Sequence, residues 1–204
     1  MFKAMASYGR PIGKLAAVAA VAVAMMPCVA ALGTSAASAA TRPATTAGAD
    51  SGLVSVAVAP GGKAWAVGGW DKGYVERSLV EQWGGRSWRL QSSPVVVGGS
   101  TSTDYLGDVA AVSASSAWAV GFAGAGPTDR TLTERWNGTS WHEVPSPTPP
   151  GKVSDGRLLG VAAISPSNAW AVGTWDTHCL VVRWDGAAWK RVLIPGPAGA
   201  AYAA

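Results

Sequence analysis

The chain has 204 residues, a formal net charge of +4, and 49% hydrophobic against 14% charged residues. This apolar share excludes an intrinsically disordered chain, and the length suits one modest domain. The aromatic residues are unevenly divided, with 11 Trp against 4 Tyr and 2 Phe. The role of the Trp residues is therefore the first structural question.

The N-terminal segment has the pattern of a secretory signal peptide. Three basic residues, the last of them Lys14, precede an uncharged Ala- and Val-rich run over 15–32, and small residues follow up to Ala39. We predict a signal peptide over 1–39 that is cleaved after Ala39, and hence a secreted or extracellular protein, with the bacterial cell envelope as a further location. A retained anchor is the alternative, because the apolar run is 18 residues long.

Cleavage would change the charge and the cysteine count. It removes three of the 16 basic residues and no acidic residue, which leaves 13 against 12. Nucleic-acid binding depends on clustered Lys and Arg, so we expect no nucleic-acid partner, and we expect no membrane span after cleavage. Cys179 would be the one remaining cysteine, which excludes an internal disulfide, and we expect its thiol to be buried.

A flexible linker rich in Thr, Ala and Gly, over 40–52, precedes three copies of one pattern. Each copy begins with Leu and ends in Ala-Trp-Ala-Val-Gly, and the Trp recurs at intervals of 53 and 52 residues. Such a period is typical of repeat architectures. We divide the domain over 53–193 into repeats 53–105, 106–157 and 158–193, followed by a disordered tail over 194–204.

Each repeat then carries two Trp five residues apart around a Gly-Gly, Asn-Gly or Asp-Gly pair. These pairs tolerate positive φ at both central positions of a type I′ turn, so each segment is predicted to be a β-hairpin. Four short strands per repeat follow; in the second repeat they cover 109–112, 117–121, 131–136 and 140–144. No sustained helical period occurs, so we expect an all-β fold of three four-stranded antiparallel repeats.

Nine of the 11 Trp occupy equivalent positions in the three repeats. We predict that they form the structural framework: Trp65, Trp83, Trp88, Trp118, Trp136, Trp141, Trp170, Trp184 and Trp189. Small residues fill the first strand of each repeat and Trp crowds the later ones. This gradient fits a β-propeller blade, which widens away from a central axis.

The run from Ala64 to Gly69, followed by Glu81, Trp83 and Trp88, resembles a kelch or galactose-oxidase-type propeller blade. The chain is also similar to Trp-rich secreted bacterial repeat proteins of unassigned activity. The resemblance implies a propeller-like domain over 53–193. Only the first repeat retains the Gly doublet of that pattern, and such folds do not carry their function with them.

Three blades are fewer than the four to eight of closed propellers. We therefore expect a partial β-propeller that self-associates to complete a ring, or a truncated relative of a larger protein. A β-trefoil, which also has three four-stranded repeats, is the alternative fold.

Catalytic and metal chemistry finds little support in the residue pattern. A galactose-oxidase-like copper site needs two His and two Tyr, and a sialidase-like site needs an Arg cluster with a Tyr-Glu pair. The two histidines of the chain, His142 and His178, lack metal-ligand spacing, and alternating Arg and Glu on the third strands is typical of salt ladders. We expect no catalytic residue, no metal and no cofactor.

Two Trp lie outside the repeat positions. Trp70-Asp71 and Trp175-Asp176 each follow an Ala-Trp motif by five residues, in the predicted loop between the second and third strands. A Trp ring beside a carboxylate suits a sugar, because the ring stacks on C–H groups and the carboxylate accepts hydroxyl hydrogen bonds. The alternative is that each Trp covers its own blade.

The sequence predicts a secreted, non-catalytic binding or scaffolding module. It would recognise a cell-envelope glycan or a protein through the propeller loops, with Trp70, Asp71, Trp175 and Asp176 as ligand-binding candidates. A glycan-active enzyme, or a truncated fragment of one, is the alternative function.

Overall fold

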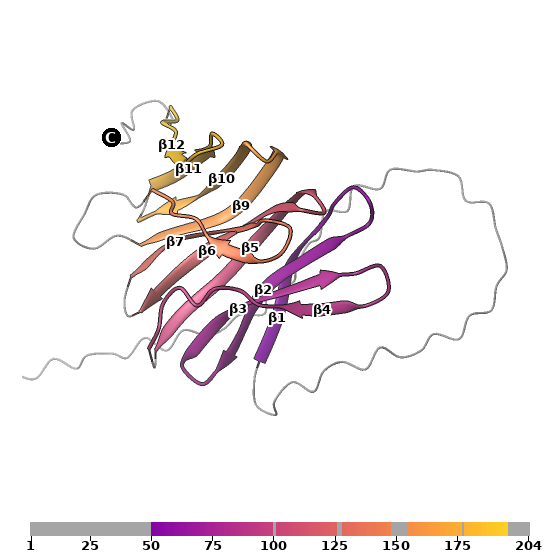
Figure 1. The fold of residues 1–204 in the computed structure, drawn as a ribbon. Coiled ribbons are helices and arrows are strands. Elements are labelled where there is room, and N and C mark those ends of the chain that lie inside the picture. Colours follow the sequence, from indigo (N-terminus) through magenta and orange to yellow (C-terminus); the bar gives the residue numbers. More distant parts are fainter. Residues whose placement is uncertain (1–49, 100, 126–127, 148–154, 177, 196–204) are drawn as a thin grey trace, which may run out of the picture. The chain divides into compact units, whose positions relative to one another are not determined.

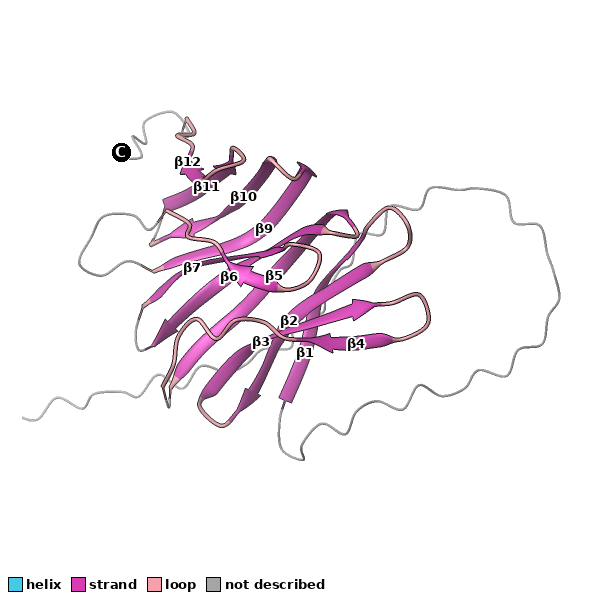
Figure 2. Cartoon of the chain, in the orientation of Figure 1, coloured by secondary structure: helices cyan, strands magenta, loops and turns pink. Residues whose placement is uncertain are grey.

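The structure is a computed structural model that describes residues 50–99, 101–125, 128–147, 155–176 and 178–195, all within the compact unit Ala40–Ala204. The predicted signal peptide, most of the predicted linker and nearly all of the predicted tail lie outside these residues. The described part contains twelve strands and no helix, which confirms the all-β prediction (Figure 2). Within these ranges, accordingly, no helix has the length and apolarity to cross a membrane.

The strands, labelled in Figure 1, are β1 (Asp50–Val58), β2 (Ala64–Lys72), β3 (Val75–Trp83), β4 (Trp88–Gln91), β5 (Ser102–Ser113), β6 (Ser116–Ala125), β7 (Asp129–Trp136), β8 (Trp141–Glu143), β9 (Gly156–Ser165), β10 (Asn168–Trp175), β11 (His178–Trp184) and β12 (Trp189–Arg191). Antiparallel pairing joins them consecutively into a first group (β1–β4), a second group (β5–β8) and a third group (β9–β12). One parallel pair, Glu76 with Thr103, links β3 to β5. The first two groups therefore form an eight-stranded sheet, and the third forms a separate four-stranded sheet.

The paired Trp residues form the predicted hairpins. Trp83 lies opposite Trp88, and the corresponding pairs in the other groups have the same register. The prediction of a type I′ turn is wrong, because φ is positive only at Gly85, Gly138 and Gly186 and not at the residue before each. Side chains determine the turn in the second and third groups: the Oδ1 atoms of Asn137 and Asp185 each accept two backbone N–H groups from the same loop. These hydrogen bonds hold loops of four residues, 137–140 and 185–188.

The Gly that ends each Ala-Trp-Ala-Val-Gly motif lies against the neighbouring strand. A Cβ atom at Gly68, Gly121 or Gly173 would collide with a backbone carbonyl oxygen of β1, β5 or β9, respectively. The register between the paired strands shifts within a residue or two of each contact. The repeated Gly is therefore a steric requirement of a close, bulged strand pair.

Two apolar clusters lie between successive groups. In the first, Trp65 packs with the second group's hairpin residues, its ring centroid 6.2 Å from that of Trp136. In the second cluster, the ring centroid of Trp118 lies 4.9 Å from the ring centroids of both Trp184 and Trp189 of the third group. The motif Trp of one group thus packs against the hairpin Trp of the next, and both Trp65 and Trp118 are 0% exposed.

Buried carboxylates fix the segment between β4 and β5 on the second group. Ser93 Oγ donates to both carboxylate oxygens of Glu134, at 2.8 and 3.0 Å, and the N–H groups of Val96 and Val97 donate to Asp104. Glu134 is fully buried. Burial raises its pKa to about 8, and the Asp104 and Glu143 carboxylates raise it as well, against the opposing effect of the Ser93 hydrogen bond.

Candidate ligand-binding site

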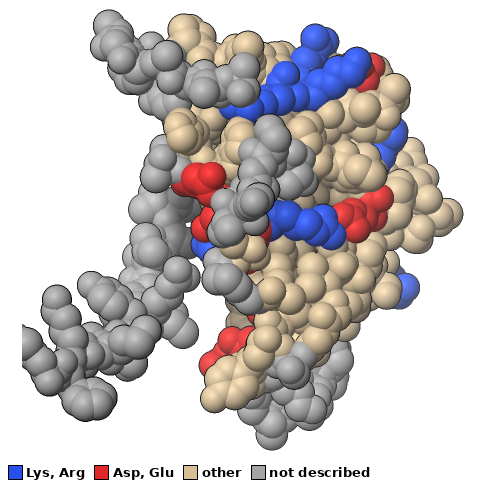
Figure 3. Space-filling model, turned by 90° about the vertical axis from the view of Figure 1, so that its left-hand side faces the viewer, with Lys and Arg blue, Asp and Glu red and all other residues tan. Residues whose placement is uncertain are grey.

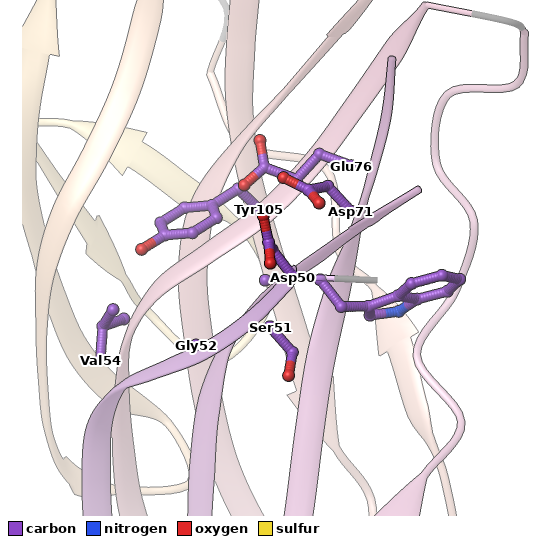
Figure 4. Close-up of a pocket in the computed structure, with 9 residues that line it drawn as sticks. Asp50, Ser51, Gly52, Val54, Asp71, Glu76 and Tyr105 are labelled. Carbon is purple, nitrogen blue, oxygen red and sulfur yellow. The ribbon is translucent and has the colours of Figure 1, made fainter. Parts of the chain in front are cut away.

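A pocket of about 220 Å³ lies where β1 and β3 begin and β2 ends, beside β5. Its wall combines acidic, aromatic and small residues (Figure 4). The lining residues are Asp50, Ser51, Gly52, Val54, Gly69, Trp70, Asp71, Glu76 and Tyr105. The first predicted ligand pair, Trp70-Asp71, therefore lies on a concave surface.

Three carboxylates of the pocket form one row across adjacent strands. Asp50 of β1 pairs with Asp71 of β2, which pairs with Glu76 of β3. Residues in such register project from the same face of a sheet with neighbouring Cβ atoms about 5 Å apart, and like charges placed so are destabilising. Figure 4 shows the three carboxyl groups gathered beside the Tyr105 ring. An acidic row of this kind favours a ligand that brings positive charge or hydrogen-bond donors.

The carboxyl group of Glu76 has a perturbed pKa. Burial raises this pKa above the usual value, and the neighbouring carboxylates of Asp71 and Asp129 raise it further, while Arg157 lowers it. Glu76 therefore retains a proton to higher pH than an exposed glutamate. It can serve as a hydrogen-bond donor in its protonated form and as an acceptor when ionised.

Tyr105 occupies space that Gly69 leaves open. A Cβ atom at Gly69 would lie 2.7 Å from Tyr105 Cδ2 and 2.9 Å from Glu76 Oε1. The Tyr105 ring packs on Phe122 at a centroid distance of 5.2 Å, and the Arg157 guanidinium lies 4.5 Å from the Phe122 ring centre. Burial and the nearby Glu76 raise the pKa of the Tyr105 hydroxyl, so it remains a hydrogen-bond donor at neutral pH.

Opposite charges lie next to the pocket. Arg157 forms ion pairs with Asp129 at 2.5 Å and with Asp155 at 3.4 Å. On the face of the molecule shown in Figure 3, basic and acidic side chains likewise lie side by side across the middle. The positive charge of Arg157 is thus largely engaged by carboxylates, and it offsets only part of the acidic row.

The structure does not bring the two predicted ligand pairs into one pocket. The prediction that they lie in loops is wrong for Trp70 and Asp71, which are within β2, and for Trp175, which ends β10. Trp70 is half-buried and lines the pocket with Asp71, whereas Trp175 packs against the second apolar cluster and has the Arg191 guanidinium 4.8 Å from its ring centre. Asp176 has a left-handed backbone with φ of 49° and accepts a hydrogen bond from the Asp155 N–H at 2.9 Å. In the third group this Trp-Asp pair contributes to packing and to a turn.

Other polar residues considered in the sequence lie apart from the pocket. His142 is on β8 and His178 on β11, and among the described residues no group of three or more His, Cys, Asp and Glu side chains has an arrangement that could hold a metal ion. The expectation that Cys179 is buried is wrong, because its side chain is exposed. It pairs with Thr174 on the face of the third group that turns away from the second apolar cluster.

Sequence reasoning missed three of the acidic and aromatic groups around the pocket. Asp50 falls in the predicted linker, and neither Glu76 nor Tyr105 is among the predicted ligand-binding residues. Asp71 and Glu76 do flank a short loop containing Gly73, a spacing that would place them opposite each other in a hairpin. That spacing was the available signal for the pair, whereas Tyr105 comes from the second group.

Fold and site together define an all-β protein of three consecutive antiparallel four-stranded groups with an acidic, aromatic-lined pocket at strand ends of the first group. No protein-family model matches the chain, and no curated protein matches it either.

Proposed function

We propose that this chain is a secreted, non-catalytic module that binds a glycan of the cell envelope. The observation that carries the proposal is the row of Asp50, Asp71 and Glu76 beside the Tyr105 ring, in a pocket that Trp70 also lines. Carboxylates accept hydrogen bonds from sugar hydroxyls, and aromatic faces pack on sugar C–H groups. Because the row is acidic, a sugar with a free amino group is the preferred ligand.

We further propose that the three groups are blades of a partial β-propeller, with a β-trefoil as the alternative. Support comes from the first strands of the groups. Asp108 of β5 accepts a hydrogen bond from Ser55 Oγ of β1 at 2.5 Å and another from the Val161 N–H of β9 at 2.8 Å. The three residues are spaced by one repeat, so equivalent strands lie side by side, as the innermost strands of propeller blades do.

A glycan array followed by calorimetric titration of the best ligand tests the binding proposal. Replacing Tyr105→Ala removes the aromatic ring beside the acidic row and Glu76→Gln removes a charged acceptor, so each is expected to weaken binding about tenfold or more. Tyr74→Ala is the matched control, since Tyr74 is exposed on the loop between β2 and β3 and does not line the pocket. Equal affinity of all four proteins would refute the site.

Hydrolysis of a glycan is the second candidate function. One observation favours it: burial raises the pKa of Glu76, which pairs with Asp71 across β2 and β3, and glycosidases use a carboxylic acid of raised pKa close to a second carboxyl group. Incubating the bound glycan with the protein and measuring new reducing ends separates the two functions. Release of reducing ends that disappears in Glu76→Gln would identify an enzyme.

A further inference from the structure

Among the residues that the structure describes, nothing covers one apolar face of the first group and one of the third. The trailing face, on β10 and β11, consists of Trp170, Val172, Val181 and Arg183; Trp170 is 40% exposed and Val172 is 50% exposed. The leading face, on β1, β3 and β4, consists of Val56, Val58, Trp83, Trp88 and Leu90; Val58 is 68% exposed. Exposed apolar surface of this kind marks an interface in a soluble protein.

We propose that this chain associates head to tail with a second copy, the trailing face of one copy docking on the leading face of the other. Inside the chain, the trailing face of one group packs on the leading face of the next at two places, and we call this contact the junction. Trp65 and Val67 of the first group occupy the positions of Trp170 and Val172, and both are fully buried against the second group. Trp118 and Val120 of the second group are buried in the same way against the third.

The leading face presents the side of the junction that accepts the motif Trp. In the third group this side is made by Trp184 and Trp189, both 4.9 Å from Trp118. The matching pair in the first group, Trp83 and Trp88, has a centroid separation of 5.7 Å and an interplanar angle of 54°, against 6.0 Å and 56° for Trp184 and Trp189. The acceptor surface is therefore preformed.

Arg183 on the trailing face has the same position relative to its Trp as Arg135 has in the internal junction. Arg135 of the second group lies over the Trp118 ring at 5.4 Å and over Trp184 of the next group at 5.6 Å. Arg183 already lies over Trp170 at 5.5 Å. In the internal junction the second Trp that the arginine contacts belongs to the following group. In the proposed dimer, Trp83 of the other copy would be the second Trp that Arg183 contacts.

A second copy is the occupant that fits, because the required partner surface belongs to this chain. The junction joins different faces, so it is heterologous, and such contacts close into rings or extend into filaments. Two copies bring six groups together, and six lies within the four to eight blades of closed propellers. The closed ring rests on the proposed blade arrangement, whereas the head-to-tail junction rests only on the packing inside the chain.

Sedimentation velocity on the full secreted chain tests the proposal. We expect twice the mass of one chain at micromolar concentration. Val172→Lys places a charge in the trailing face and Val58→Lys places one in the leading face, so each alone should weaken association about 100-fold and give monomers. Mixing the two variants should restore dimers, because each retains the face that the other has lost. Tyr74→Lys, a similar change outside both faces, should leave the mass unchanged.

Three results would overturn the proposal. A wild-type chain that stays monomeric at high micromolar concentration shows that a second copy does not cover these faces. Persistent dimers of either single variant indicate an isologous contact. Variants that retain wild-type circular dichroism but stay monomeric when mixed also contradict a head-to-tail junction. Since mass is measured without glycan, these outcomes are independent of the binding test.

Discussion

At the residue scale, one glycine in each repeat allows two neighbouring strands to approach closely. Gly121 ends the second Ala-Trp motif, and an added Cβ would overlap the carbonyl oxygen of Tyr105. The neighbouring chain is backbone and cannot rotate aside as a side chain can. Gly69 differs, because its missing Cβ leaves room for two side chains, Tyr105 and Glu76, and not for backbone. The second Gly of the doublet, present only in the first repeat, thus belongs to the pocket.

Replacing Gly121→Ala is expected to destabilise the fold by about 1–3 kcal/mol or more, because the two strands must separate to admit the methyl group. Chemical denaturation followed by Trp fluorescence measures the change. Gly98→Ala is the control, since no atom lies within 4 Å of its added Cβ. Equal midpoints for the two variants would show that the close approach of β5 and β6 carries no steric cost.

The segment between β4 and β5 couples neighbouring groups at the scale of elements. Its Ser93 hydroxyl holds the buried Glu134, and its Val96 and Val97 side chains pack against the first apolar cluster. Removing a carboxyl group from water favours the neutral acid. Attachment of this segment is therefore linked to the protonation state of one residue.

Stability is expected to fall as pH rises from about 4.5 to about 8. In that range the folded state keeps the Glu134 proton, whose pKa burial raises to about 8, while the unfolded state releases it. The unfolding free energy should decrease by up to about 1.4 kcal/mol per pH unit. Glu134→Gln should flatten this dependence and raise stability at pH 9.

Urea denaturation at several pH values measures the effect of Glu134. The control is Glu81→Gln, which changes the same residue type at the equivalent position of the first group, where the side chain is half-exposed. Because Glu81 is half-exposed and Glu134 is buried, the difference between the two variants isolates the effect of the buried carboxyl group. A Glu134→Gln variant that follows the wild-type profile would place the titrating group elsewhere.

At the scale of the whole molecule, the burial of each motif Trp depends on whether another group follows its own group in the chain. Trp118 and Trp170 belong to the same Ala-Trp-Ala-Val-Gly motif. Trp118 is fully buried because the third group covers it, whereas Trp170 has no group of this chain against it among the described residues. Identical local sequence is therefore part of the core in one place and exposed in the other, where we propose that a second copy covers it.

The two Trp residues should respond differently to truncation. Trp118→Ala is expected to lower the unfolding free energy by about 3–5 kcal/mol, because it leaves a cavity among Trp184, Trp189 and Leu158. Trp170→Ala should cost far less in dilute protein and instead lower the affinity of self-association. Thermal unfolding at low and high protein concentration separates these effects. A large loss for Trp170→Ala in the dilute monomer would contradict its assignment to the trailing face.

Much of the fold was predictable because short-range chemistry encodes it. Turn residues between Trp pairs predicted all three hairpins, and the absence of a helical period predicted the all-β class. The turn type was wrong because side-chain hydrogen bonds of Asn137 and Asp185 compete with the backbone preference. Burial of Cys179 was wrong because a residue-type average does not say which face of β11 is covered.

The sequence by itself determined the all-β class, the hairpins and the threefold repeat, whereas several strands extend beyond their predicted bounds, as β2 does through Trp70 and Asp71. Only the tertiary structure decided which Trp faces are covered and which side chains share the pocket. Asp50, Glu76 and Tyr105 come from three different strands and two groups. Burial is set by whatever packs opposite a residue, and that partner lies about one repeat away in the sequence. The Trp excess therefore encodes a repeated junction, and within the described residues the first and third groups each expose one half of it.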